Sequence, residues 1–193
     1  MSWFNPDKNI LFIHIPGTAG TSMEHAPFLG GGGHMRALDY RALDRSAFES
    51  AFKFAFARDP ADRIVSKFFH SGLKLHKYSL NKEGFKEFVH EMGERGLEPN
   101  TMYPEPGHAW IHHHFLPQWF FVSDDNDELL IDFVGRYEQL QHDWGVVCET
   151  IGINFVLPHL REGNHESYNE YHDTETLAII RRVYARDYEL FKY

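Results

Sequence analysis

The chain has 193 residues, the size of one compact domain with a sizeable core. Its 19 Lys and Arg against 28 Asp and Glu give a formal net charge of −9, with no dense basic run, which disfavours a general nucleic-acid-binding role. The sequence has neither an 18-residue apolar run nor the basic and apolar regions of a signal peptide, so we expect a cytoplasmic, soluble protein without stable membrane insertion.

The first predicted strand, residues 10–15 (ILFIHI), is a short apolar run that ends abruptly in a loop of small residues. The loop reads PGTAGTS, and Thr21 or Ser22 can cap a helix that continues beyond it. Such a loop presents unpaired backbone N–H groups and the positive end of a helix, which together favour phosphate or sulfate. It lacks the glycine spacing and the lysine of a Walker A motif, so by itself it fits an ordinary strand–helix turn equally well.

A second strand–turn–helix unit strengthens the case for a ligand. The sequence KFAFAR, residues 53–58, alternates like a strand after a short predicted helix (LDRSAFESAF), and Asp59 and Pro60 fit the start of the next helix. The side chains that would gather around a second anion are Arg58, Arg63 and Ser66. Because open α/β folds place ligands at the carboxyl edge of a parallel sheet, the two turns predict neighbouring anion pockets, suited to a ligand with phosphates at both ends of a ribose.

The rest of the chain predicts helices, a long loop and two further strands. A helix is expected after Asn81, with apolar residues at i, i+3, i+4 and i+7: Phe85, Phe88, Val89 and Met92. No period is visible from about 99 to 117, which predicts a long ordered loop of the kind that covers binding sites. WFFV and LLIDFVGR are typical of strands around the acidic turn SDDND. Helices are predicted for YEQLQHDWGVVCETIG, with Cys148 buried on its apolar stripe, and for TETLAIIRRVYARDYELFKY.

Four segments in this order resemble the sulfotransferases that use 3′-phosphoadenosine 5′-phosphosulfate (PAPS), in particular the carbohydrate and membrane-associated type and its small bacterial relatives. They are FIHIPGTAGTSM, FKFAFARDPADRIVSKFFH, DFVGRYEQLQHDW and LPHLREGNHESYNEYHDTETLAIIRRVYARDYELFKY. The resemblance covers nearly the whole chain and is weakest from about 73 to 117, which would be the variable acceptor-side lid. It implies one domain over residues 1–193, with a P-loop-kinase-like three-layer α/β fold, a short parallel central sheet flanked by helices, and no metal.

The resemblance also implies which residues hold the donor. The residues that would wrap the 5′-phosphosulfate are Gly17, Thr18, Ala19, Gly20, Thr21 and Ser22. Arg58 and Ser66 would hold the 3′-phosphate, and Arg63 would support the site or an acidic neighbour. The segment from Asn164 to Tyr168 would close over the donor. The implied activity is transfer of the sulfuryl group of PAPS to a hydroxyl acceptor, which is a glycan, a lipid or a small alcohol or phenol.

One position departs from the family pattern. The family's loop reads Pro-Lys-Thr, and its lysine contacts the bridging oxygen of the leaving phosphate, whereas this chain has Gly17 there. Loss of that cation should lower the rate by roughly 10² to 10³, by analogy with lost oxyanion donors. Three accounts stay open. Another cation, such as Arg36 or Lys67, fills the gap; the protein binds the nucleotide without transferring sulfate; or Gly17 is a drifted or engineered change in an otherwise ordinary enzyme.

Sulfuryl transfer to an alcohol is helped by a base near the acceptor oxygen, and histidine suits neutral pH. In this type of sulfotransferase the base is commonly a His or Glu between the two anion motifs. His34 occupies such a position, although a solvated loop histidine would give the same pattern. Glu24 and His25, just past the first loop, are the other candidates. His14, within the first strand, is expected to be structural.

The sequence GHAWIHHHF raises the possibility of zinc, because His108 and His112 lie four residues apart. No carboxylate is suitably spaced nearby and the family that the chain resembles needs no metal, so we expect none. We favour instead an acceptor-side lid lined by Trp110, His112, His113 and His114. A phosphoryl-transfer enzyme of related fold is disfavoured, because it would carry a Walker lysine and metal-holding side chains that this sequence lacks.

Overall fold

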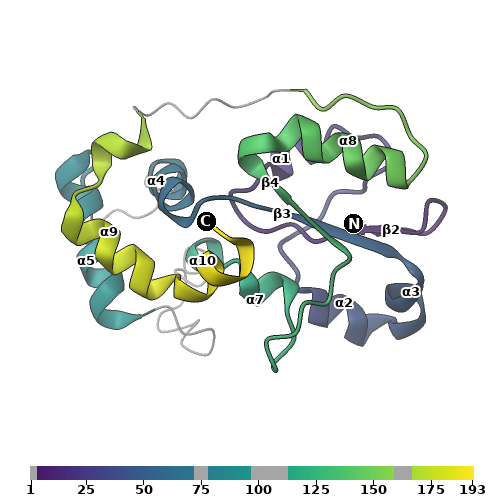
Figure 1. Cartoon of the computed structure of the whole chain (residues 1–193), viewed down its shortest axis with the longest axis horizontal. Coiled ribbons are helices and arrows are strands. Elements are labelled where there is room, and N and C mark those ends of the chain that lie inside the picture. Colours follow the sequence, from purple (N-terminus) through teal and green to yellow (C-terminus); the bar gives the residue numbers. More distant parts are fainter. Residues whose placement is uncertain (1–3, 72–77, 97–112, 159–166) are drawn as a thin grey trace. The chain divides into compact units, whose positions relative to one another are not determined.

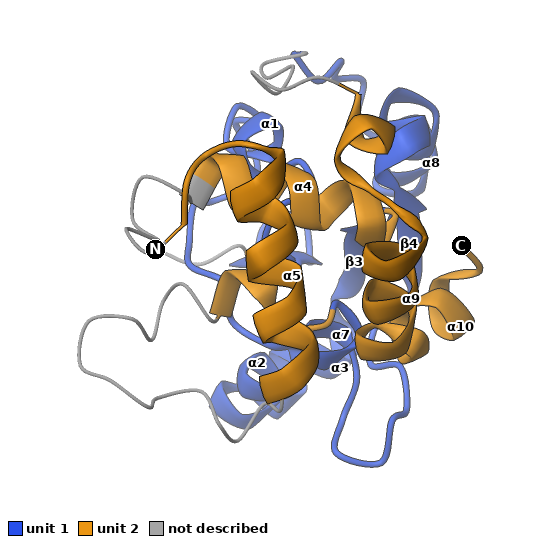
Figure 2. Ribbon diagram, turned by 90° about the vertical axis from the view of Figure 1, so that its left-hand side faces the viewer, with its two compact units in different colours: residues 1–58, 118–161 blue, residues 59–117, 162–193 orange. Residues whose placement is uncertain are grey.

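The structure of the chain is a computed structural model that describes residues 4–71, 78–96, 113–158 and 167–193 (Figure 1). These residues form two compact units, which Figure 2 colours blue and orange. The first unit comprises residues 1–58 and 118–161, and the second comprises residues 59–117 and 162–193. The prediction of a single domain stays a prediction, and each unit has its own packing.

The first unit is built on a short mixed sheet. Its strands, in spatial order, are β1 (Phe4–Asn5), β2 (Ile10–Phe12), β3 (Phe52–Ala57) and β4 (Phe133–Arg136). β1 runs antiparallel to β2, while β2, β3 and β4 run parallel to one another. The mixed α/β class and the parallel centre of the sheet are therefore confirmed. The carboxyl ends of β2, β3 and β4 lie at one edge, as they must in a parallel sheet.

Helices flank this sheet within the first unit. They are α1 (Gly20–Met23), α2 (Ala37–Leu43), α3 (Arg45–Ser50), α7 (Trp119–Val122), the 3₁₀ helix η3 (Tyr137–Gln139) and α8 (Leu140–Thr150). Figures 1 and 2 show α8 on one side of the strands and α2 and α3 on the other. The strands are thus covered on both faces, which is why β3 reads as a nearly continuous apolar run.

Aromatic side chains form the core of the first unit. Phe54 on β3 stacks on Phe12 of β2, with ring centroids 5.2 Å apart, and its centroid lies 6.2 Å from that of Trp144 on α8. The Trp144 indole N–H donates to the carbonyl oxygen of Phe155 (2.7 Å), so its polar atom is satisfied. Each such burial contributes roughly 1.5–3 kcal/mol. β3 is therefore firmly anchored, and so is the position of Arg58, which follows its last residue.

One predicted strand is a helix. WFFV forms α7, in which the Ser123 N–H donates to the carbonyl oxygen of Trp119 (3.0 Å). Beyond α7, Ser123 makes an isolated antiparallel bridge with Leu129. The strand prediction was wrong because a run of four apolar residues has no period that separates strand from buried helix.

The described part of the second unit is helical. Its elements are α4 (Pro60–Ser71), α5 (Lys82–Arg95), the 3₁₀ helix η4 (Tyr168–Tyr171), α9 (Thr174–Val183) and α10 (Ala185–Phe191). α4 and α5 begin where the sequence predicts. Asp59 Oδ1 accepts the Ala61 N–H (2.8 Å), and Asn81 Oδ1 accepts the Gly84 N–H (2.9 Å). The apolar stripe of α5 is buried in a cluster with side chains of α4 and α9. None of the helices described here or in the first unit is long and apolar enough to cross a membrane.

The C-terminal helix is interrupted at Tyr184, where α9 ends and α10 begins. The Tyr184 side chain is fully buried, and its O–H donates to the carbonyl oxygen of Phe115 (2.6 Å). Burial raises the pKa of this phenol, which stays protonated and keeps the hydrogen bond. The sequence predicted one long helix, because its apolar period continues across the break.

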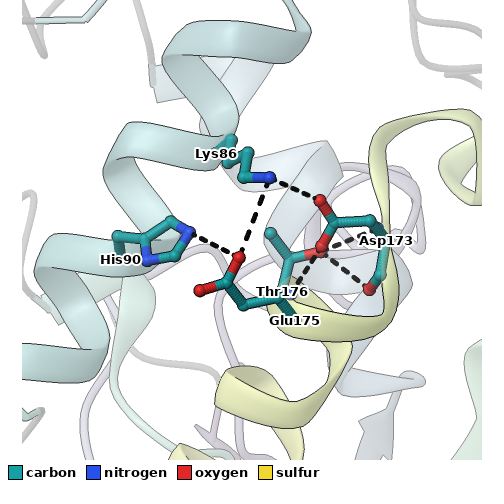
Figure 3. A network of polar contacts seen from close by, with 5 residues as sticks. All are labelled: Lys86, His90, Asp173, Glu175 and Thr176. Atoms are coloured by element: carbon teal, nitrogen blue, oxygen red, sulfur yellow. Dashed lines mark hydrogen bonds and ion pairs between the residues drawn. The ribbon is translucent and has the colours of Figure 1, made fainter.

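Figure 3 shows the polar contacts that join α5 to the start of α9. The Lys86 Nζ lies 2.7 Å from Asp173 Oδ2 and 3.8 Å from Glu175 Oε2, and His90 Nε2 lies 3.6 Å from the same Glu175 oxygen. Asp173 is also the N-cap of α9, since its Oδ1 accepts the Thr176 N–H (2.8 Å). The hydrogen bond from Lys86 and the one from Thr176 hold the pKa of the Asp173 carboxyl below its usual range. Because these ion pairs are exposed, each adds little to stability.

Candidate functional site

Three segments of the first unit meet at the carboxyl edge of its sheet. The loop at residues 16–22 follows β2, Arg58 follows β3 and Tyr137 follows β4. β2 and β3 are parallel and in register, with Phe12 opposite Phe54. The prediction that the two turns lie at the same edge of a parallel sheet is therefore confirmed. In open α/β folds this edge is where ligands bind.

The loop at residues 16–22 turns through two left-handed residues, Gly17 (φ 86°) and Ala19 (φ 75°). Thr18, between them, is fully buried, and its Oγ1 donates to the carbonyl oxygen of Ile15 (2.8 Å). A left-handed backbone conformation costs roughly 1–2 kcal/mol in a residue that has a Cβ, whereas glycine adopts it without a comparable cost. The backbone at residue 17, the position at which the resemblance led us to expect lysine, thus favours glycine. At Ala19 the strain is retained, as is common where the backbone faces a ligand.

Helix α1 begins earlier than the sequence predicts. Ala19 is its N-cap, without a side-chain cap, and the Ala19 carbonyl oxygen accepts the N–H groups of Ser22 (2.9 Å) and Met23 (3.1 Å). The prediction that Thr21 or Ser22 caps this helix is wrong, because the left-handed Ala19 starts the helix before them. The N–H groups of Gly20 and Thr21, in the first turn, have no acceptor within the described part of the chain. These two groups can donate to an anion.

Arg58 is held at the edge by its neighbours in the first unit. Gln118, itself fully buried, pairs with both backbone groups of Arg58: its Oε1 accepts the Arg58 N–H (2.9 Å) and its Nε2 donates to the Arg58 carbonyl oxygen (2.8 Å). The guanidinium carbon lies 4.2 Å from the ring centroid of Tyr137, and Nη1 donates to the Gly17 carbonyl oxygen (3.4 Å). A cation is therefore fixed beside the loop whose N–H groups can bind an anion.

Two histidines meet against the same loop. The ring centroids of His14, just after β2, and His34 lie 4.3 Å apart, and His14 also stacks on Phe12 (5.7 Å). Gly20 packs directly on His14, because a Cβ at residue 20 would lie 1.8 Å from His14 Nε2. His14 thus connects the loop to His34. Its expected structural role is consistent with these contacts, and they also bring the partly exposed His34 close to the loop.

The other two candidates for the base are more open to solvent. Glu24 and His25 are both exposed, just after α1. His25 Nδ1 lies 3.0 Å from the carbonyl oxygen of Thr21, so its ring folds back onto its own helix. Two of the three candidates are thus connected to the loop: His25 contacts the Thr21 carbonyl oxygen directly, and His34 packs on His14, which contacts Gly20.

Arg63 and Ser66 lie on α4 in the second unit, whereas Arg58 ends a segment of the first. Arg63 is fully buried, and its Nη2 donates to the carbonyl oxygens of Leu116 (2.7 Å) and His114 (3.2 Å). These contacts give Arg63 a structural role inside its own unit. Ser66 is partly buried on the second turn of α4. That Arg63 also supports the ligand, and that Ser66 joins Arg58 around one phosphate, stay predictions.

Arg36, one of the cations considered for the gap at Gly17, is engaged elsewhere. Its Nε donates to the carbonyl oxygen of Phe120 (2.9 Å), its guanidinium carbon lies 4.0 Å from the Phe120 ring centroid, and its Nη2 lies 3.3 Å from Asp125 Oδ1. These contacts hold Arg36 at α7, so in this structure it does not substitute for the missing lysine. Lys67, the other candidate, is buried on α4 in the second unit.

Several predicted site residues lie outside the described part of the chain. They are Trp110, His112 and Asn164, together with residues 73–77 and 97–112 of the expected lid. His113 and His114 are described, with ring centroids 6.4 Å apart. Among the described residues, no three His, Cys, Asp or Glu side chains are grouped so that they could hold a metal ion. Cys148 is buried, as expected.

Local sequence patterns assigned no site role to three residues at this edge: Gln118, Tyr137 and His14, of which only His14 was considered, as a structural residue. Tyr137 directly follows β4, so the carboxyl-edge rule applied to the third parallel strand would have found it. His14 shares a strand face with Phe12 by period 2, a weaker signal. Gln118 pairs with Arg58 across 60 residues, and no local pattern indicates that contact.

Comparison with known proteins relates the chain to enzymes of sulfate transfer. A family model described as "Sulfotransferase family" matches residues 1–193. Two proteins called carbohydrate sulfotransferase 10, from Homo sapiens and Pongo abelii, are each 25% identical over 178 residues, with 74% of this chain and 47% of the relative covered. The chain thus spans about half the length of the curated relatives it matches. No solved structure matches it significantly.

Proposed function

Because the chain belongs to the sulfotransferase family, we propose that it transfers the sulfuryl group of PAPS to a hydroxyl-bearing acceptor. The observation that carries this proposal is the meeting of loop N–H donors and the Arg58 guanidinium at one sheet edge. The names of the two relatives favour a carbohydrate among the possible acceptors. We propose the P-loop-kinase-like three-layer arrangement for the fold.

In this proposal the loop binds the 5′-phosphosulfate of the donor. The residues concerned are Gly17, Thr18, Ala19, Gly20, Thr21 and Ser22. A left-handed residue followed by a helical one aims successive N–H groups into a concavity that suits an anion, and Ala19 and Gly20 have this sequence of conformations. Arg58, with Ser66, binds the 3′-phosphate through charge-assisted hydrogen bonds.

PAPS, when bound, supplies the activated sulfuryl group. As the acceptor oxygen bonds to sulfur, the bond from sulfur to the 5′-phosphate oxygen breaks and adenosine 3′,5′-bisphosphate is released. An imidazole nitrogen of His34 takes the acceptor proton. The N–H groups of Gly20 and Thr21 stabilise the negative charge that develops on the phosphate oxygen. Glu24 and His25 are the alternative bases.

The backbone at Gly17 favours a second candidate, a nucleotide-binding protein of the same fold without transferase activity. Gly17 has φ 86°, and Arg36 is held at α7 rather than at the loop. A protein of this kind would keep its affinity for the nucleotide and lack the cation that assists the leaving group.

Product release from PAPS in the presence of a panel of saccharides tests the proposal. We expect turnover by the wild-type protein and a loss of about 10²- to 10⁴-fold in His34→Ala, because the base is removed. His142→Ala, at an exposed histidine of α8 in the same unit, is the matched control and should retain wild-type turnover. Tight nucleotide binding without transfer to any saccharide would favour the second candidate, and full activity in His34→Ala would contradict the assignment of the base.

Paired substitutions at residue 17 separate a weakened catalyst from a binding protein. Gly17→Lys and Gly17→Ala carry the same backbone cost of roughly 1–2 kcal/mol, but the lysine alone adds a charge. The ratio of their turnover rates therefore isolates the effect of the cation. We expect Gly17→Lys to exceed Gly17→Ala by about 10- to 1000-fold if the chain is a weakened enzyme. Equal rates would show that the cation is dispensable or that the protein only binds.

A further inference from the structure

We infer that Tyr137 is a positioning residue for Arg58: its ring fixes the guanidinium in the orientation that binds the 3′-phosphate of the nucleotide. The inference rests on the proposed function, in which Arg58 contacts that phosphate. It adds a residue from the third parallel strand to a site so far built from the first two.

The Arg58 side chain is fixed from both ends. At the backbone, Gln118 makes hydrogen bonds of 2.9 and 2.8 Å to the Arg58 N–H and carbonyl groups. At the guanidinium, the carbon atom lies 4.2 Å from the Tyr137 ring centroid, and Nη1 donates to the Gly17 carbonyl oxygen at 3.4 Å. Arg58 as a whole residue is 8% exposed, so the ring attracts a cation that is largely shielded from water.

The stacked arrangement leaves the chemistry of the arginine intact. All five N–H donors of a guanidinium lie in its plane and point outward from its edge. A ring that covers one face attracts the cation without using any of these donors. Tyr137 can therefore set the plane of the guanidinium while its edge stays directed at the loop, and less conformational entropy is lost when a phosphate binds.

The backbone that carries Tyr137 is held independently of Arg58. Tyr137 is the first residue of η3, directly after β4. The preceding N–H, that of Arg136, donates to Asp143 Oδ2 on α8 (2.6 Å), which ties this turn to a helix of the same unit. The turn that carries the ring is thus fixed to α8, and we expect the turn to keep its place when Arg58 is replaced.

A second stacked arginine in the same unit provides a contrast. Arg36 lies 4.0 Å from the Phe120 ring centroid, but its Nη2 pairs with the Asp125 carboxylate and its Nε bonds to a carbonyl oxygen. Stacking alone therefore does not mark a ligand site. The Arg58–Tyr137 pair differs because both residues directly follow parallel strands at the carboxyl edge, beside the loop.

The test is calorimetric titration with two nucleotides, adenosine 3′,5′-bisphosphate and adenosine 5′-monophosphate, which lacks the 3′-phosphate. Tyr137→Leu should weaken bisphosphate binding by about 3- to 30-fold and leave monophosphate binding unchanged, while Tyr137→Phe, which keeps the ring, should bind both like the wild type. Phe120→Leu, which removes the ring beneath Arg36, should keep the wild-type preference for the bisphosphate. Equal weakening of both nucleotides by Tyr137→Leu, or no weakening, would overturn the inference.

Fluorinated phenylalanines at residue 137 keep the test decisive if Tyr137→Leu does not fold. They preserve the shape of the ring and progressively remove the negative charge on its face, so bisphosphate affinity should fall with each added fluorine; a flat series would overturn the inference.

Arg58→Ala distinguishes a failure of the inference about Tyr137 from a failure of the proposed function. If it abolishes the preference for the bisphosphate while Tyr137→Leu retains it, the inference alone fails. If the wild type binds no bisphosphate, or Arg58→Ala keeps the preference, the proposed function fails and the inference falls with it.

Discussion

Arg58 and Arg63 belong to one short motif, ARDPADR, yet they lie in different surroundings. In the first unit, Arg58 lies with one face on the Tyr137 ring and one N–H on a carbonyl of the loop. In the second unit, Arg63 is fully buried, and its Nη2 donates to two carbonyl oxygens. The same residue type is thus used at a sheet edge in one case and inside a helical core in the other. Spacing in the sequence selects both arginines as candidates, but burial and partners decide what each can do.

The largest expected effect is on folding, through Arg63→Ala. The Leu116 carbonyl oxygen would lose its donor in a buried site, at about 1–3 kcal/mol, and the His114 carbonyl oxygen would lose one in a partly buried site. The cavity left by the buried side chain would add to this cost. We expect a loss of roughly 3 kcal/mol or more in the free energy of unfolding, measured by urea denaturation. Arg181→Ala, at an exposed arginine of α9, is the control and should change stability by less than about 0.5 kcal/mol. If Arg63→Ala were as stable as the wild type but had lost nucleotide binding, Arg63 would be a ligand-binding residue like Arg58, and the structural role assigned to it would be wrong.

A smaller effect is expected for Gly20→Ala, which tests the packing of the loop. The new Cβ would overlap the His14 ring, so the ring and its neighbour His34 must move. We expect about 1–3 kcal/mol of destabilisation by urea denaturation, together with a loss of turnover greater than the loss of nucleotide affinity. Gly145→Ala, at a helical glycine of α8 with open space around it, is the matched control and should not destabilise. If Gly20→Ala kept wild-type stability and turnover, the contact between His14 and the loop would have no functional consequence.

The smallest effect is expected at the exposed network of the second unit. Asp173→Ala removes the N-cap of α9 and the partner of Lys86, at a cost of about 1 kcal/mol. The pKa of Asp173 is lower in the folded state than its ordinary value. The ionised carboxylate therefore stabilises the folded protein fully above the ordinary carboxyl pKa, and this stabilisation is lost as the pH falls below about 4. The stability difference between wild type and Asp173→Ala should therefore shrink in acid. A difference that grew on acidification would contradict the assigned direction of the shift.

The sequence predicts most of the helix starts and strands that local residue patterns determine. The N-caps Asp59 and Asn81 mark the starts of α4 and α5, and apolar runs mark β2 and β3. Errors arise where tertiary contacts decide. WFFV has no period to show that it is helical. The break at Tyr184 coincides with a buried hydrogen bond to Phe115, which is distant in the sequence.

In the candidate site, too, some residues have local sequence signals and others are placed by contacts between distant parts of the chain. The loop at residues 16–22 and Arg58 are predictable, because each follows a parallel strand and so lies at the carboxyl edge. The partners that orient them are not, since Gln118 and Tyr137 reach Arg58 from distant parts of the chain. The left-handed start of α1 at Ala19 could not be predicted either, because alanine has no preference for positive φ.

The central claim is that Arg58 and the loop form the binding site of a nucleotide that carries a 3′-phosphate. It is tested most directly by calorimetric titration of the wild type, Arg58→Ala and Arg36→Ala with adenosine 3′,5′-bisphosphate. Arg36→Ala is the matched control, because it removes another stacked arginine of the same unit, away from the loop. The account predicts micromolar binding by the wild type and Arg36→Ala, and a loss of about 10- to 150-fold in Arg58→Ala. No binding by the wild type, or equal affinity in all three proteins, would contradict it.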